Sequence, residues 1–146
     1  MEVGRSAVRV DAADKVSGRA KYTDDLIPRP HLVAKILHAT IANGVVTAIR
    51  TERAARLPGV VKIVTCLDVP EIQYPTPGHP WSTETAHQDV SDRRLLTDRV
   101  RYYGDDIAAV VAEDEVSAIR ALQAIEVEYD QWEPLLTTQA AMAPGW

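Results

Sequence analysis

Histidines and a carboxylate in residues 79–89 come nearest to a metal-binding or acid–base pattern. His79, His87 and Asp89 lie in one proline-rich stretch together with Trp81. Imidazole and carboxylate groups bind divalent metals, and a histidine that titrates near neutrality can act as a general base. Both roles need partners that converge on one point. Loop histidines beside prolines are more often surface groups, so we interpret His79 and Trp81 as candidate interface residues.

Adjacent acids form a second pattern that suggests carboxylate chemistry, at Asp24-Asp25, Asp105-Asp106 and Glu113-Asp114-Glu115. The triplet fits the N-terminus of a helix better, because the helix dipole favours negative charge there. Asp105-Asp106 follows Gly104 and indicates a turn into an apolar strand. A capping or turn role before Ile27–Pro30 fits Asp24-Asp25 better than catalysis.

The only cysteine, Cys66, lies inside the apolar run VVKIVTC. One cysteine excludes an intrachain disulfide and any all-cysteine zinc or iron–sulfur site within one chain. A thiol packs well among apolar side chains, so we interpret Cys66 as a small core residue. The sequence contains no G-x-G-x-x-G, P-loop or H-E-x-x-H motif. We predict no catalytic, cofactor-binding or metal-binding residue in this chain.

Composition and charge narrow the class of protein. The 146 residues carry a net charge of −5, with +4 in residues 1–60 and −9 in residues 61–146. Basic residues are interspersed with acids, which is not the pattern of a nucleic-acid binder. A positive edge that meets another protein surface fits this asymmetry better. No apolar run reaches the length of a membrane span and the N-terminal residues lack the apolar block of a signal peptide, so we expect a soluble, cytoplasmic protein.

Hydrophobic periodicity predicts an α/β domain with a mixed sheet of about five strands and two main helices. The N-terminal residues 1–30 are expected to form an extended arm, 31–140 the domain, and 141–146 the start of a following region. Residues 68–99 are predicted to be one long loop, which compact domains rarely contain unless it is functional or docks on something else. The strands are expected at 32–41, 45–51, 60–66, 107–114 and 126–130, and the helices at 52–57 and 115–125.

Four local signals refine this prediction. Asn43-Gly44 is a strong hairpin signal, so the strand after it is expected to pair back onto residues 32–41. Thr51 and Asp114 are expected to cap the two helices. The near-continuous apolar run of residues 107–114 indicates a strand buried on both faces. The apolar face of the second helix is predicted to be formed by Val116, Ile119 and Leu122.

Several segments, taken in order, resemble a known family. They are GRAKYTDDL, LPGVVKIVTCLDVP, GHPWSTE, DRRLLTDRVRYYGDDIAAVVAEDE and IEVEYDQWEPLLT. Together they resemble the N-terminal α/β-hammerhead domain of the molybdenum-binding subunit of xanthine dehydrogenase and aldehyde oxidase. The resemblance spans residues 3–140 and is closer to bacterial xanthine dehydrogenase-type subunits than to carbon monoxide dehydrogenases.

The resemblance implies a molybdenum hydroxylase. A molybdopterin-bound molybdenum hydroxylates a heterocycle or aldehyde with oxygen from water, and electrons leave through 2Fe–2S clusters and FAD in partner domains or subunits. The pterin loops and the catalytic glutamate of the family lie beyond this sequence, so no catalytic residue is carried over. One departure is Gly104-Asp105-Asp106, where the family often has Gln or Glu and then Pro or Ala. The added negative charge argues against direct pterin contact there.

The segment Asp14–Leu26 matches the entry segment of the family. The resemblance assigns Tyr22 as a packing anchor, Asp24 as a cap or ion-pair partner, and Lys21 as a third interface residue toward neighbouring domains. Two alternatives remain open at this stage. One is a free-standing interaction module that docks through residues 68–99, and the other is a small enzyme that uses His79, His87 and Asp89.

Overall fold

The chain divides into two units, Met1–His31 and Leu32–Trp146. The computed structural model describes residues 3–4, 6–75 and 90–143. The first unit contains two short helices, α1 (Ala12–Val16) and α2 (Thr23–Leu26), and neither buries a residue. At the start of α2 the carboxylate of Asp25 accepts the backbone N–H of Tyr22 at 3.0 Å. No helix of the described residues is long and apolar enough to cross a membrane.

The second unit contains every strand and helix expected from hydrophobic periodicity. Its elements are β1 (Val33–His38), β2 (Gly44–Arg50), α3 (Glu52–Ala55), β3 (Val60–Thr65), β4 (Tyr74–Pro75), β5 (Ser91–Arg93), β6 (Arg99–Val100), β7 (Asp106–Ala112), α4 (Glu115–Ala124), β8 (Glu126–Gln131) and α5 (Thr138–Ala141). The α/β class is confirmed. The stretch 68–99 is not a plain loop, because β4 and β5 fall within it and β6 begins at its last residue.

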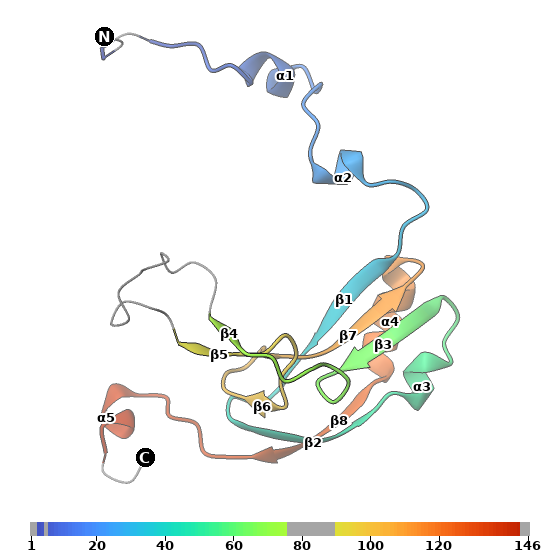
Figure 1. The fold of residues 1–146 in the computed structure, drawn as a ribbon, viewed down its shortest axis with the longest axis vertical. Helices are drawn as coiled ribbons and strands as arrows, with labels where there is room; N and C mark the ends of the chain where they lie inside the picture. Colours follow the sequence, from blue (N-terminus) through green and yellow to red (C-terminus); the bar gives the residue numbers. More distant parts are fainter. Residues whose placement is uncertain (1–2, 5, 76–89, 144–146) are drawn as a thin grey trace. The chain divides into compact units, whose positions relative to one another are not determined.

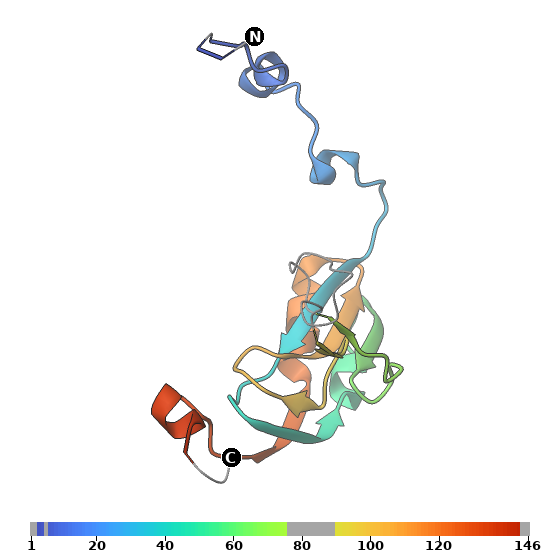
Figure 2. The same cartoon turned by 60° about the vertical axis from the view of Figure 1, so that its left-hand side comes forward.

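The strands form the sheets β1-β7-β3, β6-β2-β8 and β4-β5. Every pairing in these described sheets is antiparallel, so the expected mixed sheet is wrong. The expected hairpin across residues 43–44 is also wrong, because β2 pairs with β8 and β6 instead of β1. Figure 1 and Figure 2 both show β2 and β8 running together, apart from β1 and β7.

Asn43 and Gly44 serve this long-range pairing instead of a tight turn. The Asn43 side chain donates to the backbone carbonyl of Glu133 at 2.8 Å, and the backbone carbonyl of Asn43 accepts the N–H of Trp132 at 3.0 Å. Gly44 pairs with Gln131 on β8 and with Val100 on β6. The two residues therefore hold the end of β8 against the start of β2.

Strand β7 is the centre of the core, between β1 and β3. Ile107 and Val110 are both 0% exposed, each in a different apolar cluster. Helix α4 packs on one face of this sheet (Figure 1). The cluster on that face also contains Ala54 of α3 and the alanines Ala118, Ala121 and Ala124 of α4.

The predicted apolar face of α4 is wrong at two of its three positions, Val116 and Ile119. Val116 is 57% exposed and Ile119 is 41% exposed, whereas Ala118 and Ala121 are 0% exposed. Valine and isoleucine are more hydrophobic than alanine, so a pattern based on hydrophobicity places them in the core. A helix that lies close against strands, however, has room at the contact only for methyl groups. The structure therefore buries the alanine stripe and leaves Val116 and Ile119 largely exposed, while Leu122 packs half-buried against the same cluster.

The N-cap of α4 is as predicted, and that of α3 is not. Asp114 accepts the N–H of Ser117 at 2.8 Å and its hydroxyl at 2.9 Å. These bonds favour the ionised carboxylate and lower the pKa of Asp114 below its ordinary value. Thr51 has φ −110° and ψ −6° and makes no capping side-chain bond, so α3 begins without a side-chain cap.

Candidate functional site

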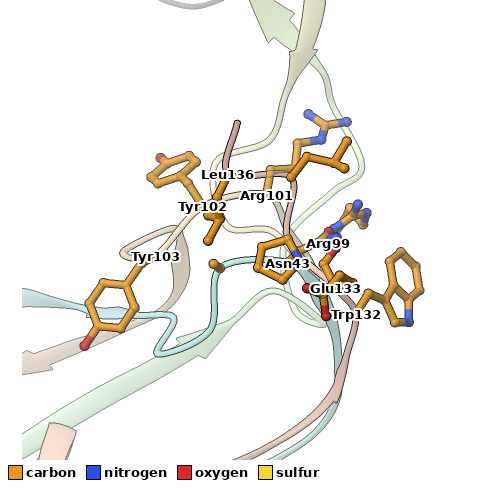
Figure 3. A pocket seen from close by; sticks show the side chains of 11 residues that line it. Asn43, Arg99, Arg101, Tyr102, Tyr103, Trp132, Glu133 and Leu136 are labelled. Atoms are coloured by element: carbon orange, nitrogen blue, oxygen red, sulfur yellow. Dashed lines mark hydrogen bonds between the residues drawn. The ribbon is translucent and has the colours of Figure 1, made fainter. Parts of the chain in front are cut away.

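A groove of about 940 Å³ lies beside the β6-β2-β8 sheet in the second unit. Three chain segments line it: the turn before β2, the segment from β6 toward β7, and the residues after β8 (Figure 3). We call it the β8 groove. Its lining residues are Ala42, Asn43, Arg99, Arg101, Tyr102, Tyr103, Trp132, Glu133, Pro134, Leu135 and Leu136.

One wall of the β8 groove is a stacked pair, Arg99 and Trp132. The Arg99 guanidinium lies 4.6 Å from the centroid of the indole ring, a favourable cation–π distance. The same guanidinium donates to the carbonyl of Gly44 at 3.1 Å and to that of Val100. The indole N–H donates to Asp130 at 3.0 Å. Arg99 therefore joins β6 to β2 and serves the fold as well as lining the groove.

Asp105 holds the turn at the opposite wall. It is 4% exposed, and its Oδ2 accepts the N–H of Arg101 at 3.1 Å. Arg93 Nη1 lies 3.7 Å from Oδ1, and its guanidinium stacks 5.0 Å from the centroid of the Tyr102 ring. A hydrogen bond to the Tyr102 hydroxyl raises the pKa of Arg93. As predicted from the acid pair, Asp105 has a turn role, and its buried charge has cationic and N–H partners.

The apolar part of the β8 groove is open to solvent. Trp132, Tyr102 and Leu135 are each 43% exposed, Tyr103 is 71% exposed, and Leu136 is 79% exposed. Large aromatic and aliphatic side chains that gather on an exposed surface mark contact sites between proteins or domains. The groove therefore has the chemistry of a contact surface, in which aromatic and aliphatic side chains lie beside Arg99, Arg101 and Glu133.

Cys66 lies away from this groove and is only partly exposed. Burial, and then the negative charge of Asp98, raise the pKa of the thiol to about 11. The thiol is therefore neutral at pH 7, whereas nucleophilic cysteines have a lowered pKa. Cys66 packs against the cluster around Ile107, which agrees with the interpretation as a small core residue.

The residues singled out from the sequence lie either in the first unit or outside the described residues. Lys21, Tyr22 and Asp24 lie in the first unit and are exposed, Tyr22 by 59%. Among the described residues Asp24 has no partner, and the cap of α2 is its neighbour Asp25. His79 and Trp81 lie outside the described residues, as do His87 and Asp89 of the proposed metal set.

The sequence profile described as aldehyde oxidase and xanthine dehydrogenase, a/b hammerhead domain, matches residues 17–133. The chain belongs to this family. It is 43% identical over 136 residues to the xanthine dehydrogenase molybdenum-binding subunit of Escherichia coli O157:H7, across 93% of this chain and 18% of that protein. The hammerhead chain thus spans less than a fifth of the length of this relative.

Solved structures agree with the hammerhead fold. The quinoline 2-oxidoreductase of Pseudomonas putida 86 superposes with a TM-score of 0.80 at 26% identity, over 97% of this chain and 18% of that one. The aldehyde oxidoreductase of Desulfovibrio desulfuricans superposes with a TM-score of 0.78 at 28% identity, over 94% of this chain and 15% of that one. The predicted hammerhead fold is confirmed by these superpositions.

The hammerhead residues described here do not fit a molybdenum site of their own. In residues 3–4, 6–75 and 90–143, no three His, Cys, Asp or Glu side chains gather as metal ligands. The buried carboxylate of Asp105 already has Arg101 and Arg93 as partners. We therefore assign no described residue to a cofactor.

Sequence reasoning missed Arg99 and Trp132 as site residues. A signal was present, because Trp132 stands two residues after the alternating segment EVEYD, between Asp130 and Glu133. An aromatic residue in such polar surroundings is typical of a contact surface. The stacking on Arg99 depends on the pairing of β6 and β8 with β2, which no local pattern predicts.

Proposed function

We propose that this chain is the N-terminal structural domain of a xanthine dehydrogenase-type molybdenum hydroxylase. The whole enzyme hydroxylates a purine or another heterocycle in the cytoplasm, with oxygen taken from water. The observation that carries this proposal is the 43% identity to a xanthine dehydrogenase molybdenum-binding subunit across 93% of the chain. Identity to the aldehyde oxidoreductase and quinoline oxidoreductase structures is lower, at 28% and 26%.

The cofactors belong to other parts of this enzyme. Molybdopterin-bound molybdenum is held by the remainder of the molybdenum-binding subunit, and the 2Fe–2S clusters and FAD by partner domains or subunits. The geometry supports a scaffold role for the present chain. Its buried charge, Asp105, holds a turn, and Arg99 ties strands together through backbone carbonyls. The chain by itself is inactive.

The complete reading frame that contains this chain provides the test of this function. We expect the full-length protein, expressed with the genes beside it, to contain molybdenum and to transfer ¹⁸O from labelled water to a purine. The 146-residue chain alone should contain no stoichiometric molybdenum and should turn over no heterocycle. A reading frame that ends near residue 146, with a stable partner bound through residues 68–99, would instead establish a free-standing interaction module.

We further propose that the first unit is an interface arm that contacts the remaining molybdenum subunit or the iron–sulfur protein. The support is exposure: Lys21, Tyr22 and Asp24 have no buried contacts within the described unit, and Val10 and Leu26 are 100% and 68% exposed. His79 and Trp81 are assigned to the same role on their sequence context alone. Apolar side chains displayed in this way gain stability only when a partner covers them.

The double substitution Lys21→Ala and Tyr22→Ala tests the arm. We expect at least a fivefold loss of subunit co-purification from the full-length enzyme, because an aromatic anchor and a cation are removed from the contact. The matched control is Lys15→Ala, an exposed lysine of α1 that pairs locally with Asp11 at 2.7 Å. Assembly at the level of this control, with normal stability, would refute the arm as an interface.

A further inference from the structure

The face of the β1-β7-β3 sheet opposite α4 is apolar and only partly covered. Register places Ala34 beside Val111, and Ile36 beside Ala109, across the β1–β7 pair. Val64 continues the second of these rows onto β3, opposite Ala109. Strand alternation puts all five side chains on one side of the sheet. We call this surface the open sheet face.

The pattern of burial separates this face from the one under α4. Along β1 the side chains alternate between half-buried and exposed, with Ile36 38% exposed. Along β7 the buried residues Val110 and Ala112 alternate with the half-buried Ala109 and Val111. In the part of the chain that the structure describes, α4 thus covers one side and leaves the other open.

A bulge in β3 extends the open sheet face. The register shifts between Val60 and Lys62, so that the pairing of Val111 with Lys62 leaves Val61 as an extra residue. A bulge turns its side chains toward one face of the sheet, and Val61 is 52% exposed. The far end of the face is closed by His38 and Asp106, whose Nδ1 and Oδ1 atoms lie 2.9 Å apart. Lys62 pairs with Val111 and lies on the same side of the sheet, so this surface is apolar along β1 and β7 and carries a cation on β3.

An antiparallel sheet with one solvated face normally alternates apolar and polar residues. Strand β7 does not, because IAAVVA is apolar at every position from Ile107 to Ala112. A strand of this composition is typical of a sheet covered on both faces. The second cover is not supplied by the described residues, since Ile36 and Val61 remain 38% and 52% exposed.

We propose that the open sheet face is the docking surface for the remainder of the molybdenum-binding subunit, which presents an apolar helix or strand face. This inference rests on the proposed function. One observation favours this occupant over a second copy of the chain. A relative that aligns over 93% of this chain is more than five times as long, since the alignment is 18% of its length.

Cysteine labelling in the full-length subunit tests the proposal. The variant Ala34→Cys, in a Cys66→Ala background, is treated with N-ethylmaleimide, and alkylation of residue 34 is followed by peptide mass spectrometry. We expect alkylation at least tenfold slower in the folded subunit than in the 146-residue chain, because the docked element excludes the reagent. The urea-unfolded subunit should label at the rate of the free chain and serves as the reagent control. Equal rates in the folded subunit and the free chain would overturn the proposal.

A charge substitution gives an independent readout. Ile36→Asp should lower the unfolding midpoint of the full-length subunit and leave that of the 146-residue chain within 2 °C of the parent, roughly the size of a small surface effect. Thr47→Asp, at an exposed position of β2, is the matched control and should lower neither. Concentration-dependent protection of the thiol introduced at position 34 in the free chain would show a second copy as the occupant and overturn the proposal. The molybdenum content of the unsubstituted subunit is measured separately. A subunit without molybdenum would contradict the proposed function, whereas equal labelling rates at residue 34 would contradict only the docking proposal.

Discussion

Substitution of Gly44 by alanine is expected to lower the free energy of unfolding by about 3 kcal/mol, the upper end of the usual cost of overpacking. A Cβ at this position would lie 2.3 Å from the backbone carbonyl oxygen of Asp130, 2.7 Å from Cδ1 of Ile41 and 3.1 Å from Cα of Gln131. A side chain such as Ile41 can rotate away, but the carbonyl of β8 cannot. The β2–β8 pairing must therefore open to admit one methyl group.

Urea denaturation followed by circular dichroism measures this loss, and Gly104→Ala is the control. Gly104 has φ +98°, and a Cβ there would meet nothing within 4 Å. Its substitution should cost only about 1 kcal/mol, the penalty of a left-handed backbone for a residue with a Cβ. Equal losses in the two variants would mean that the close approach of β2 and β8 does not determine the effect of Gly44.

Local signals predicted the elements whose cause is local. Asp114 caps α4 because its carboxylate reaches the N–H of Ser117, three residues on. The apolar run of β7 is recognisable as a central strand from composition alone, and β7 is the middle strand of its sheet. Val127 and Tyr129 alternate on β8 and pack into the same cluster, as their period of two predicts.

The pairing of β2 and the formation of the two-residue strands depend on residues far apart in the sequence, and the sequence analysis did not predict them. Asn43-Gly44 has the composition of a two-residue hairpin, yet Asn43 bonds to Trp132 and to Glu133, the latter 90 positions further along. The strands β4 and β6 each contain two residues, which is too short for an alternation of apolar and polar residues to be recognised. Such pairs exist only because a partner strand is in place.

The β8 groove was equally beyond a local pattern, because it is assembled from three separate segments around Asn43, Tyr102 and Trp132. The resemblance to the hammerhead family was the one signal that spanned most of the chain, and the matching profile covers residues 17–133. It identified the fold and the family. It could not reveal which surfaces stay exposed, since exposure is a property of the packed structure.

Replacement of Ala121 by leucine is the second large effect we expect, with a loss of about 2 kcal/mol or more from overpacking. Ala121 is 0% exposed, like Val110 and Ala112 of β7 in the same cluster. Three added carbon atoms would push α4 away from the sheet and weaken its contacts with β1, β7 and β3. Urea denaturation of the chain measures the change.

The matched variant is Ile119→Ala, two positions earlier on α4. Ile119 is 41% exposed, so its truncation removes little buried area and should cost less than about 1 kcal/mol. The hydrophobicity pattern predicts the reverse order, because it places Ile119 in the core and leaves Ala121 outside. If Ile119→Ala proves the more destabilising of the two, α4 packs by its large aliphatic face and the close contact between its alanines and β7 is wrong. The order of the two losses in free energy of unfolding therefore shows whether α4 packs on the sheet through its large aliphatic side chains or through its alanines.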